Sequence, residues 1–175
     1  MLGPLRLLAE RAASPLGEMV LITDGQGRLR AADWVSHAAR LHTLLARQFR
    51  TTDFVLIDGP PSAASSAMAA YFAGDLAAID MLAVEAAGTA FQSAVWRALR
   101  DIPAGQTIAY RELASRAGNP AAIRAAGTAN GANPISIVVP CHRVIGTDGM
   151  LTGYGGGMER KRWLLDHEAS WCRQS

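Results

Sequence analysis

The chain has 175 residues, half of them apolar and 18% charged, with a formal net charge of +2. This composition supports a folded core and excludes wholesale disorder, and no apolar stretch approaches the roughly 18 residues that a membrane span needs. Arg6, Glu10 and Arg11 interrupt the N-terminal region in which a signal peptide would carry an apolar run. We therefore expect a cytoplasmic protein whose two cysteines are free thiols.

Charge is unevenly distributed along the chain. Residues 1–90 hold seven Arg and nine Asp or Glu (net −2), whereas residues 91–175 hold ten Lys or Arg and six Asp or Glu (net +4). A modestly basic second half would tolerate an anionic partner such as nucleic acid, although such a balance is also common without one. Neither the cysteines nor the four histidines have zinc-ligand spacing, so we expect no metal and no cofactor.

Residues 1–80 are predicted to form a small α+β domain. Apolar periodicity and turn residues predict three strands, a helix, a short strand and a second helix, over residues 5–12, 18–23, 29–34, 36–49, 54–57 and 62–72. Asp24-Gly25 marks the tight turn between the second and third strands. The Gly-bounded segment 75–88 is predicted to be the linker to a second domain.

Residues 88–170 are predicted to form a mostly helical domain. Thr89 and Gln92 fit a capping box at the start of a helix that Pro103 ends. Further helices are predicted over residues 110–117, 120–130 and 158–168, the second of them starting with Asn119 as N-cap and Pro120 as its first residue. Two short helices joined by a Gly-containing turn are typical of a helix-turn-helix, although any corner between two helices can show this pattern.

The helix predicted over residues 120–130 consists mainly of Ala and Gly, so one face of it can approach another backbone closely. Arg124 is the one large charged side chain on it. A solvated surface arginine is the simpler interpretation. The functional interpretation is a helix that lies against a nucleic-acid groove, with Arg124 reaching into the base stack.

The run Pro140-Cys141-His142-Arg143-Val144 contains the strongest chemical signal. A thiol beside basic groups is a candidate nucleophile, because the thiolate is the reactive form and nearby positive charge favours it. A buried structural cysteine is the alternative. Because adjacent residues point in different directions, His142 would act on Cys141 through a water molecule. Asp166 and Glu168 are both available to orient His142, and the sequence does not choose between them.

A second unusual stretch, Gly153-Tyr154-Gly155-Gly156-Gly157, can adopt positive φ angles and expose backbone N–H groups. No Gly-Lys-Ser/Thr follows it, which disfavours a phosphate-binding loop. A flexible wall over a flat substrate, with Tyr154 as a stacking face, fits better.

Taken together, these motifs resemble the O6-alkylguanine-DNA alkyltransferases of the short bacterial type. The resemblance is strong over about residues 88–168 and loose before that. Its most specific part is the run from Asn133-Pro134 through Pro140-Cys141-His142-Arg143-Val144. The resemblance implies a ribonuclease H-like α/β N-terminal unit and a winged-helix-like C-terminal domain with a helix-turn-helix.

The family resemblance also implies a reaction. Cys141 would take the alkyl group of O6-alkylguanine in duplex DNA irreversibly and once per molecule, with O4-alkylthymine as a second candidate substrate. His142 would deprotonate Cys141 through a water, and Glu168 would orient His142. Tyr110 would protonate the leaving guanine at N3 and help to rotate the nucleotide, which must leave the base stack to be reached. Asn133 would tie the recognition helix to the active-site loop.

The implied partner is alkylated double-stranded DNA, bound through its minor groove by a monomer, with cooperative assembly left open. Arg124 would fill the vacated stack, and Ala125, Gly127 and Tyr110 belong to the same DNA-binding face.

The carbonyls of Cys141 and Val144 would accept from the guanine amino group, and Tyr154 and the Gly155 backbone would line the pocket. Some relatives carry a serine at the position of Gly155, so we expect a pocket that tolerates bulkier alkyl groups. Some also bind zinc in the N-terminal part through cysteine and histidine. This part of the chain has no cysteine, so we expect no zinc.

Three other functions remain open on the residues alone. A non-catalytic protein that binds alkylated DNA would not need Cys141. A cysteine hydrolase using Cys141 and His142 would turn over. A transcription regulator would use the helix-turn-helix, but the chain has no room for a second DNA-binding unit.

Overall fold

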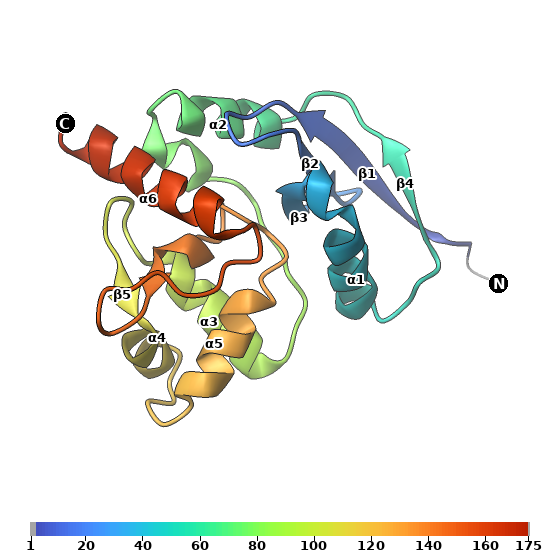
Figure 1. The fold of residues 1–175 in the computed structure, drawn as a ribbon. Coiled ribbons are helices and arrows are strands. Elements are labelled where there is room, and N and C mark those ends of the chain that lie inside the picture. The colour runs from blue at the N-terminus through green and yellow to red at the C-terminus, as the bar shows by residue number, and fades with distance from the viewer. Residues whose placement is uncertain (1–2, 175) are drawn as a thin grey trace. The chain divides into compact units, whose positions relative to one another are not determined.

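The computed structural model describes residues 3–174, which divide into two compact units between Ala87 and Gly88. The first unit contains a four-stranded sheet in the order β3-β2-β1-β4 (Figure 1). Its strands are β1 (Leu5–Ala12), β2 (Met19–Thr23), β3 (Leu29–Trp34) and β4 (Phe54–Asp58). The first three are antiparallel neighbours joined by short turns, whereas β4 pairs parallel to β1. The strands lie where the sequence predicts them.

One face of the sheet is covered by α1 (Ala38–Phe49), which follows the 3₁₀ turn η1 (Val35–His37). Leu41 and Leu45 of this helix pack on Leu7, Ile22 and Ala31 of the strands and form a buried core. Apolar residues at helical spacing thus meet alternate residues of the strands, as the amphipathic pattern requires.

The helix α2 (Ala63–Phe72) begins with a capping box formed by Ser62 and Ser65. Glu10 of β1 accepts hydrogen bonds from the Ser62 backbone N–H (3.2 Å) and hydroxyl (2.6 Å). The negative charge of Glu10 therefore lies at the positive end of the helix dipole, which stabilises both.

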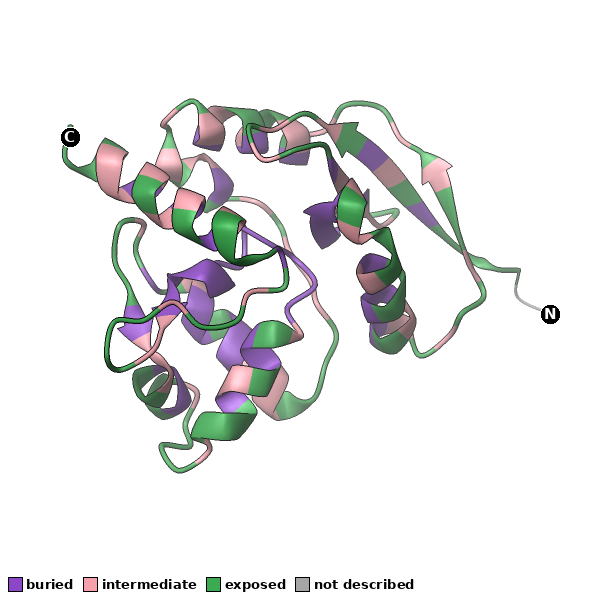
Figure 2. Cartoon of the chain, in the orientation of Figure 1, coloured by how far each residue is buried: buried purple, intermediate pink, exposed green. Residues whose placement is uncertain are grey.

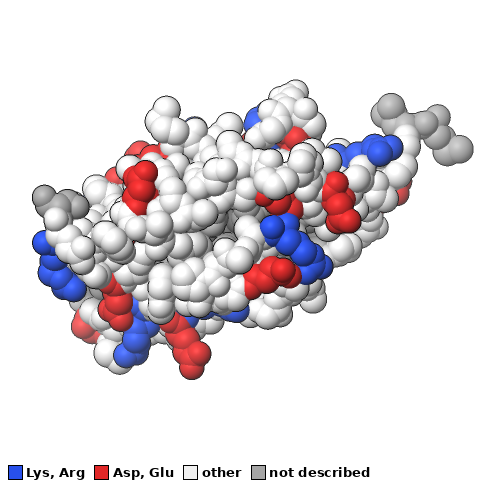
Figure 3. Space-filling model, turned by 90° about the horizontal axis from the view of Figure 1, so that it is seen from above, with Lys and Arg blue, Asp and Glu red and all other residues white. Residues whose placement is uncertain are grey.

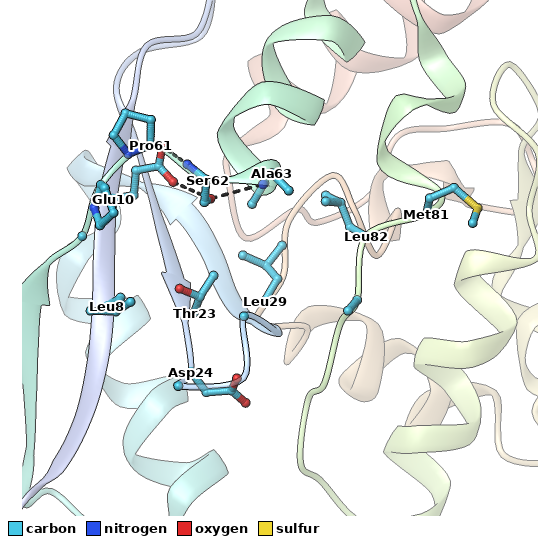
Figure 4. Close-up of a pocket in the computed structure, with 16 residues that line it drawn as sticks. Leu8, Glu10, Thr23, Asp24, Leu29, Pro61, Ser62, Ala63, Met81 and Leu82 are labelled. Carbon is cyan, nitrogen blue, oxygen red and sulfur yellow. Dashed lines mark hydrogen bonds between the residues drawn. The ribbon is translucent and has the colours of Figure 1, made fainter.

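A cavity of about 400 Å³ lies within this unit. Figure 4 shows Glu10 and Ser62 at one end of it and Asp24 at the other, with Leu29 between them. Asp24 accepts from Arg28 Nε (2.9 Å) and Arg30 Nη1 (3.1 Å), so both carboxylates on the wall are already bound to protein groups.

The segment predicted as a linker is folded instead. It forms the 3₁₀ turn η2 (Leu76–Ile79), and the Leu29 N–H donates to the Ala83 carbonyl (2.8 Å) while the Glu85 N–H donates to the Leu29 carbonyl (3.0 Å). The physical reason is that Ile79 is apolar and buried, so the segment packs on the first unit.

The second unit is mostly helical. Its elements are α3 (Ala90–Arg100), β5 (Ile108–Ala109), α4 (Tyr110–Arg116), α5 (Ile123–Gly131), η3 (Cys141–Arg143), β6 (Val144–Ile145) and α6 (Met158–Cys172). The capping box of Thr89 and Gln92 is confirmed at the start of α3. The short strands β5 and β6 pair in parallel and were not predicted, because two residues are too few to show an alternating pattern.

The predicted start of α5 at Asn119-Pro120 is wrong. These residues form a turn closed by the Ala122 N–H on the Asn119 carbonyl (3.0 Å), and the helix begins at Ile123 without a side-chain cap. A turn and a first helical turn share Asn and Pro as favoured residues, so the signal was ambiguous.

Within residues 3–174, no helix is long and apolar enough to cross a membrane. On the face of the molecule drawn in Figure 3, basic and acidic side chains are interspersed rather than gathered into one broad patch.

Candidate active site

The chain from Asn133 to Val144 is buried without interruption, as the purple segment leading into η3 shows (Figure 2). A buried loop needs partners for its backbone polar groups, since an unpaired group is costly away from water. The side chain of Asn133 provides several of them. Its Nδ2 donates to the carbonyls of Val139 (2.7 Å) and Ile135 (3.3 Å), and its Oδ1 accepts from the Ile135 N–H (2.9 Å).

Cys141 lies at the end of this loop, at the first residue of η3, and is 5% exposed. Its Sγ is 3.2 Å from Asn133 Nδ2, so the sulfur has a polar donor beside it rather than hydrocarbon alone. Asn130 of α5 donates to the Cys141 carbonyl (3.4 Å). The sequence did not point to Asn130, which adds a bond from α5 to the loop. Asn133 lies between the two, since its backbone N–H donates to the Asn130 carbonyl (3.4 Å) and its side chain bonds the loop.

His142 and Glu168 form a buried pair, with His142 Nε2 2.8 Å from Glu168 Oε1 and both side chains fully buried. Arg143 reinforces the carboxylate through Nε (3.0 Å to Oε2) and Nη2 (2.8 Å to Oε1), and the Gly105 N–H donates to Oε2 (3.2 Å). Asp166 is exposed. The structure therefore places Glu168, and not Asp166, behind His142.

The protonation states of the pair follow from burial and from the neighbouring charges. Burial lowers the pKa of His142, and Arg143 and Lys161 lower it further, while Glu168 raises it without restoring the usual value. Burial raises the pKa of Glu168, but His142 and Arg143 more than offset this and hold that pKa far below its ordinary range. The site thus contains a neutral imidazole and a carboxylate.

The ring orientation follows from the hydrogen bond to Glu168. A neutral His142 whose Nε2–H donates to this carboxylate has Nδ1 as its acceptor. Nδ1 is buried and has no hydrogen-bond partner among the described residues. A water molecule there would satisfy it, as expected if the imidazole takes the thiol proton through water.

Lys161, the sole lysine of the chain, is a buried residue that sequence reasoning did not assign to the site. Its Nζ donates to the carbonyls of Val144 (2.6 Å) and Thr152 (2.8 Å). Burial lowers the pKa of Lys161, and negative charge on Cys141 raises it. The same attraction favours the thiolate of Cys141. The helical spacing of Lys161, Leu164 and Glu168, all buried, is the signal that could have found it.

Tyr110 and Gly127 meet where α4 packs on α5. A Cβ atom at Gly127 would lie 3.7 Å from the Tyr110 ring, an ordinary van der Waals distance, so the ring lies directly over this position of α5. The Tyr110 hydroxyl oxygen accepts from the Thr152 hydroxyl (3.2 Å), which leaves its own proton free to be donated.

The outer face of α5 is exposed at Arg124 and Ala125. A groove of about 590 Å³ runs between this face and the start of α3. It is lined by Thr89, Phe91, Gln92, Ala121, Ala122, Arg124, Ala125, Thr128 and Ala129. Most of these side chains are small, which permits close approach by a partner.

Known proteins match both the sequence and the overall fold of this chain. The family model described as "6-O-methylguanine DNA methyltransferase, DNA binding domain" matches residues 90–170. The methylated-DNA–protein-cysteine methyltransferase of Salmonella typhimurium is 52% identical over 94% of this chain and 96% of its own length. The Mycobacterium tuberculosis protein of the same name is 45% identical over 90% and 89%. The chain belongs to the methylated-DNA–protein-cysteine methyltransferase family.

Solved structures of the family agree. The crystal structure of the M. tuberculosis O6-methylguanine methyltransferase superposes with a TM-score of 0.76 at 39% identity, covering 94% of this chain and 93% of that one. The same mycobacterial protein in complex with DNA gives 0.77, also at 39% identity, over 94% of both chains. The O6-methylguanine-DNA methyltransferase of Pyrococcus kodakaraensis gives 0.72 at 27% identity, over 93% and 98%. The expected family and the mixed α+β fold class are thereby confirmed.

The structure brings four of the predicted catalytic residues into two contacts. Cys141 contacts Asn133 through its sulfur, and His142 contacts Glu168 through its imidazole. The predicted pocket residues are less uniform: Tyr154 is half-buried and Gly155 is exposed. The carbonyl of Val144, expected to accept from a substrate, already accepts from Lys161, although a carbonyl oxygen can accept twice.

Proposed function

We propose that this chain repairs alkylated DNA directly, by moving the alkyl group from O6 of guanine to the sulfur of Cys141. O4-alkylthymine is a second candidate substrate. The observation that carries the proposal is the buried Cys141 beside a neutral His142, whose Nδ1 has no partner among the described residues and whose Nε2 is held by Glu168, in a member of this family.

The reaction needs a thiolate. The thiol proton of Cys141 passes through a water molecule to His142 Nδ1, and the resulting imidazolium is stabilised by Glu168. Lys161 and the Nδ2 donor of Asn133 favour the negative sulfur. The sulfur then forms a bond to the alkyl carbon as the bond from that carbon to guanine O6 breaks.

The leaving guanine takes the electron pair of the broken bond and needs a proton. Tyr110 can donate it to N3, because its hydroxyl oxygen accepts from Thr152 and its proton is not used by that contact. The tyrosinate then regains a proton from water, and the His142 imidazolium gives its proton up to water, so the charges balance. The thioether on Cys141 has no leaving group that water displaces readily, so each molecule acts once.

We further propose that α4 and α5 act as a helix-turn-helix laid against the minor groove. The exposed face with Ala125 and the small residue Gly127 permits close approach, and Arg124 fills the gap that the flipped nucleotide leaves. The flipped base would lie between the carbonyls of Cys141 and Val144 and the loop with Tyr154 and Gly155.

At the level of architecture, we propose a ribonuclease H-like first domain over residues 1–80 and a winged-helix-like second domain over residues 88–170. We expect a cytoplasmic monomer that needs no metal or cofactor. Elemental analysis of the purified protein tests the last point, and a stoichiometric metal would contradict it.

A stoichiometric transfer assay separates this function from its alternatives. The protein is mixed with increasing amounts of duplex DNA carrying one radiolabelled O6-methylguanine, from a limiting amount to an excess over the protein. An alkyl acceptor gains at most one label per molecule. A non-catalytic binder leaves the label on the DNA, and a hydrolase releases it repeatedly; either result would contradict the proposal.

A further inference from the structure

A β-branched residue with positive φ lies four residues before the nucleophile. Ile137 has φ = 71° and is fully buried. Positive φ is costly for any residue with a Cβ atom, and most of all for a β-branched one. Arg50 is the other non-glycine residue with positive φ in the described part of the chain, and it ends α1, where this geometry is common. Ile137 ends no helix.

The conformation of Ile137 closes a tight bend. The Val138 N–H donates to the Ser136 carbonyl (2.9 Å), a hydrogen bond that spans a single residue. With positive φ at that residue, this is the strained form of the γ-turn, which is rare in proteins. Strain of this kind persists only where the surroundings hold it, and it is concentrated at functional sites.

A second bend follows at once. The Cys141 N–H donates to the Val139 carbonyl (2.8 Å) around Pro140, whose φ of −83° and ψ of 67° give the relaxed form of the same turn. The chain therefore reverses its direction twice between Ser136 and Cys141. The first bend sets the direction from which the second one starts.

Asn133 holds both sides of the strained residue. Its Nδ2 bonds the carbonyl of Ile135 before it and that of Val139 after it, and the same nitrogen lies 3.2 Å from the sulfur of Cys141. The Val139 N–H also donates to the Ile135 carbonyl (3.0 Å), which closes the loop around Ile137. The ends of the bend are thus fixed to the atom that contacts the nucleophile.

We propose that Ile137 is a positioning residue for alkyl transfer: its left-handed backbone conformation, and not only its buried side chain, fixes the direction of the Cys141 sulfur. This inference rests on the function proposed above. A displacement requires the attacking sulfur, the alkyl carbon and O6 nearly in line. A shift of about 1 Å in such a geometry can lower a rate by about 100-fold.

The test compares Ile137→Val, Ile137→Ala and Ile137→Gly in the full chain. Each variant is measured for thermal unfolding, for the single-turnover methyl-transfer rate at saturating O6-methylguanine duplex, and for the DNA concentration that gives half this rate. Valine keeps the β-branched side chain and should react within about threefold of the wild type. Alanine loses packing but keeps a Cβ atom, so positive φ stays costly and the range of backbone conformations stays narrow. Glycine removes that cost and widens the range of conformations open to the backbone.

The expected result is a reversed order of stability and rate. Ile137→Gly should unfold at the same temperature as Ile137→Ala or at a higher one. It should nevertheless transfer the methyl group about tenfold more slowly than Ile137→Ala, with the half-saturating DNA concentration unchanged. Reaction of Cys141 with iodoacetamide, which needs a nucleophilic thiol but no fixed approach, should be as fast in glycine as in alanine.

Two results would overturn the inference. One is a glycine variant that transfers as fast as alanine, since packing alone would then explain the site. The other is a glycine variant less stable than alanine, since residue 137 would then carry no strain. Failure of the proposed function is a separate result, because the wild-type protein itself would gain no methyl group.

Discussion

The side-chain amide of Asn133 lies 3.2 Å from the sulfur of Cys141 and, through the same nitrogen, 2.7 Å from the Val139 carbonyl. One buried amide therefore satisfies the loop and faces the nucleophile. This arrangement joins stability to reactivity, because whatever displaces the amide disturbs both.

Replacing this amide should have two effects. Asn133→Ala removes one of the two donors from each of the Ile135 and Val139 carbonyls and leaves the buried Ile135 N–H without its acceptor, and an unsatisfied buried group costs about 1–3 kcal/mol. We expect the free energy of unfolding in urea to fall by at least about 2 kcal/mol, and the methyl-transfer rate to fall with it. Asn119→Ala, at an exposed turn, is the matched control and should change stability by less than about 0.5 kcal/mol. Equal stability of the two variants would contradict the role of Asn133.

The His142 base predicts the acid limb of the rate profile. Because burial lowers the pKa of His142 below its usual 6.5, more than half of the imidazole is neutral at pH 6.5, and its protonation has its midpoint at a lower pH. The single-turnover transfer rate should therefore fall in acid as His142 is protonated, with a midpoint below pH 6.5. His37→Gln, in the other unit, should leave the profile unchanged. A midpoint above 6.5 would contradict the assignment of His142 as a neutral base.

The free energy of unfolding should also fall in acid, because of the buried pair His142 and Glu168. The pKa values of both His142 and Glu168 are lower in the folded protein than their ordinary values of 6.5 and 4.5, so the unfolded chain binds the protons first as pH falls. The contribution of this pair to the free energy of unfolding is therefore fully present above pH 6.5. The part that comes from His142 is lost as pH falls below 6.5, and the part that comes from Glu168 is lost below 4.5. Unfolding in urea at a series of pH values between 7 and 4 measures this.

Glu168→Gln isolates the carboxylate. It leaves the Arg143 cation buried without its counter-charge, which costs about 3–5 kcal/mol at neutral pH. Below about pH 4.5, the variant should lose less additional stability than the wild type, because the titrating group is gone. Asp166→Asn, an exposed acid on the same helix, serves as control. An unchanged acid slope in the Glu168 variant would refute this account.

Arg124 should matter only when a base must leave a duplex. Arg124→Ala removes the side chain proposed to fill the vacated stack, so methyl transfer from duplex DNA should slow by about tenfold or more. Transfer from free O6-methylguanine base, which needs no flipping, should be unaffected. Arg47→Ala, an exposed arginine of α1, removes the same charge elsewhere. Equal slowing with both substrates would exclude a flipping role.

Much of the fold could be predicted from the sequence, because local signals agreed with the tertiary structure. The capping residues Ser62 and Thr89 mark the starts of α2 and α3. The start of α5 could not be predicted, since Asn119-Pro120 is equally suited to a turn. The positive φ of Ile137 could not either, because isoleucine itself disfavours it and only the surrounding contacts impose it.

The site was partly predictable for a similar reason. Cys141 and His142 are adjacent in the sequence, so their motif is visible. The choice of Glu168 over Asp166 depends on which side of α6 is buried, and the missed Lys161 lies on that same side. Both could have been found from the spacing of buried positions along this helix, whereas the bond from Asn130 to the loop depends on tertiary packing.

The central claim is that the sulfur of Cys141 keeps the alkyl group. Peptide mapping by mass spectrometry, after the protein has reacted with a duplex that contains O6-methylguanine, tests this most directly. We predict one added methyl group on the peptide that carries Cys141, none on Cys172, and none in the Cys141→Ser variant. A methyl group on any other residue, or its retention by the serine variant, would contradict the account.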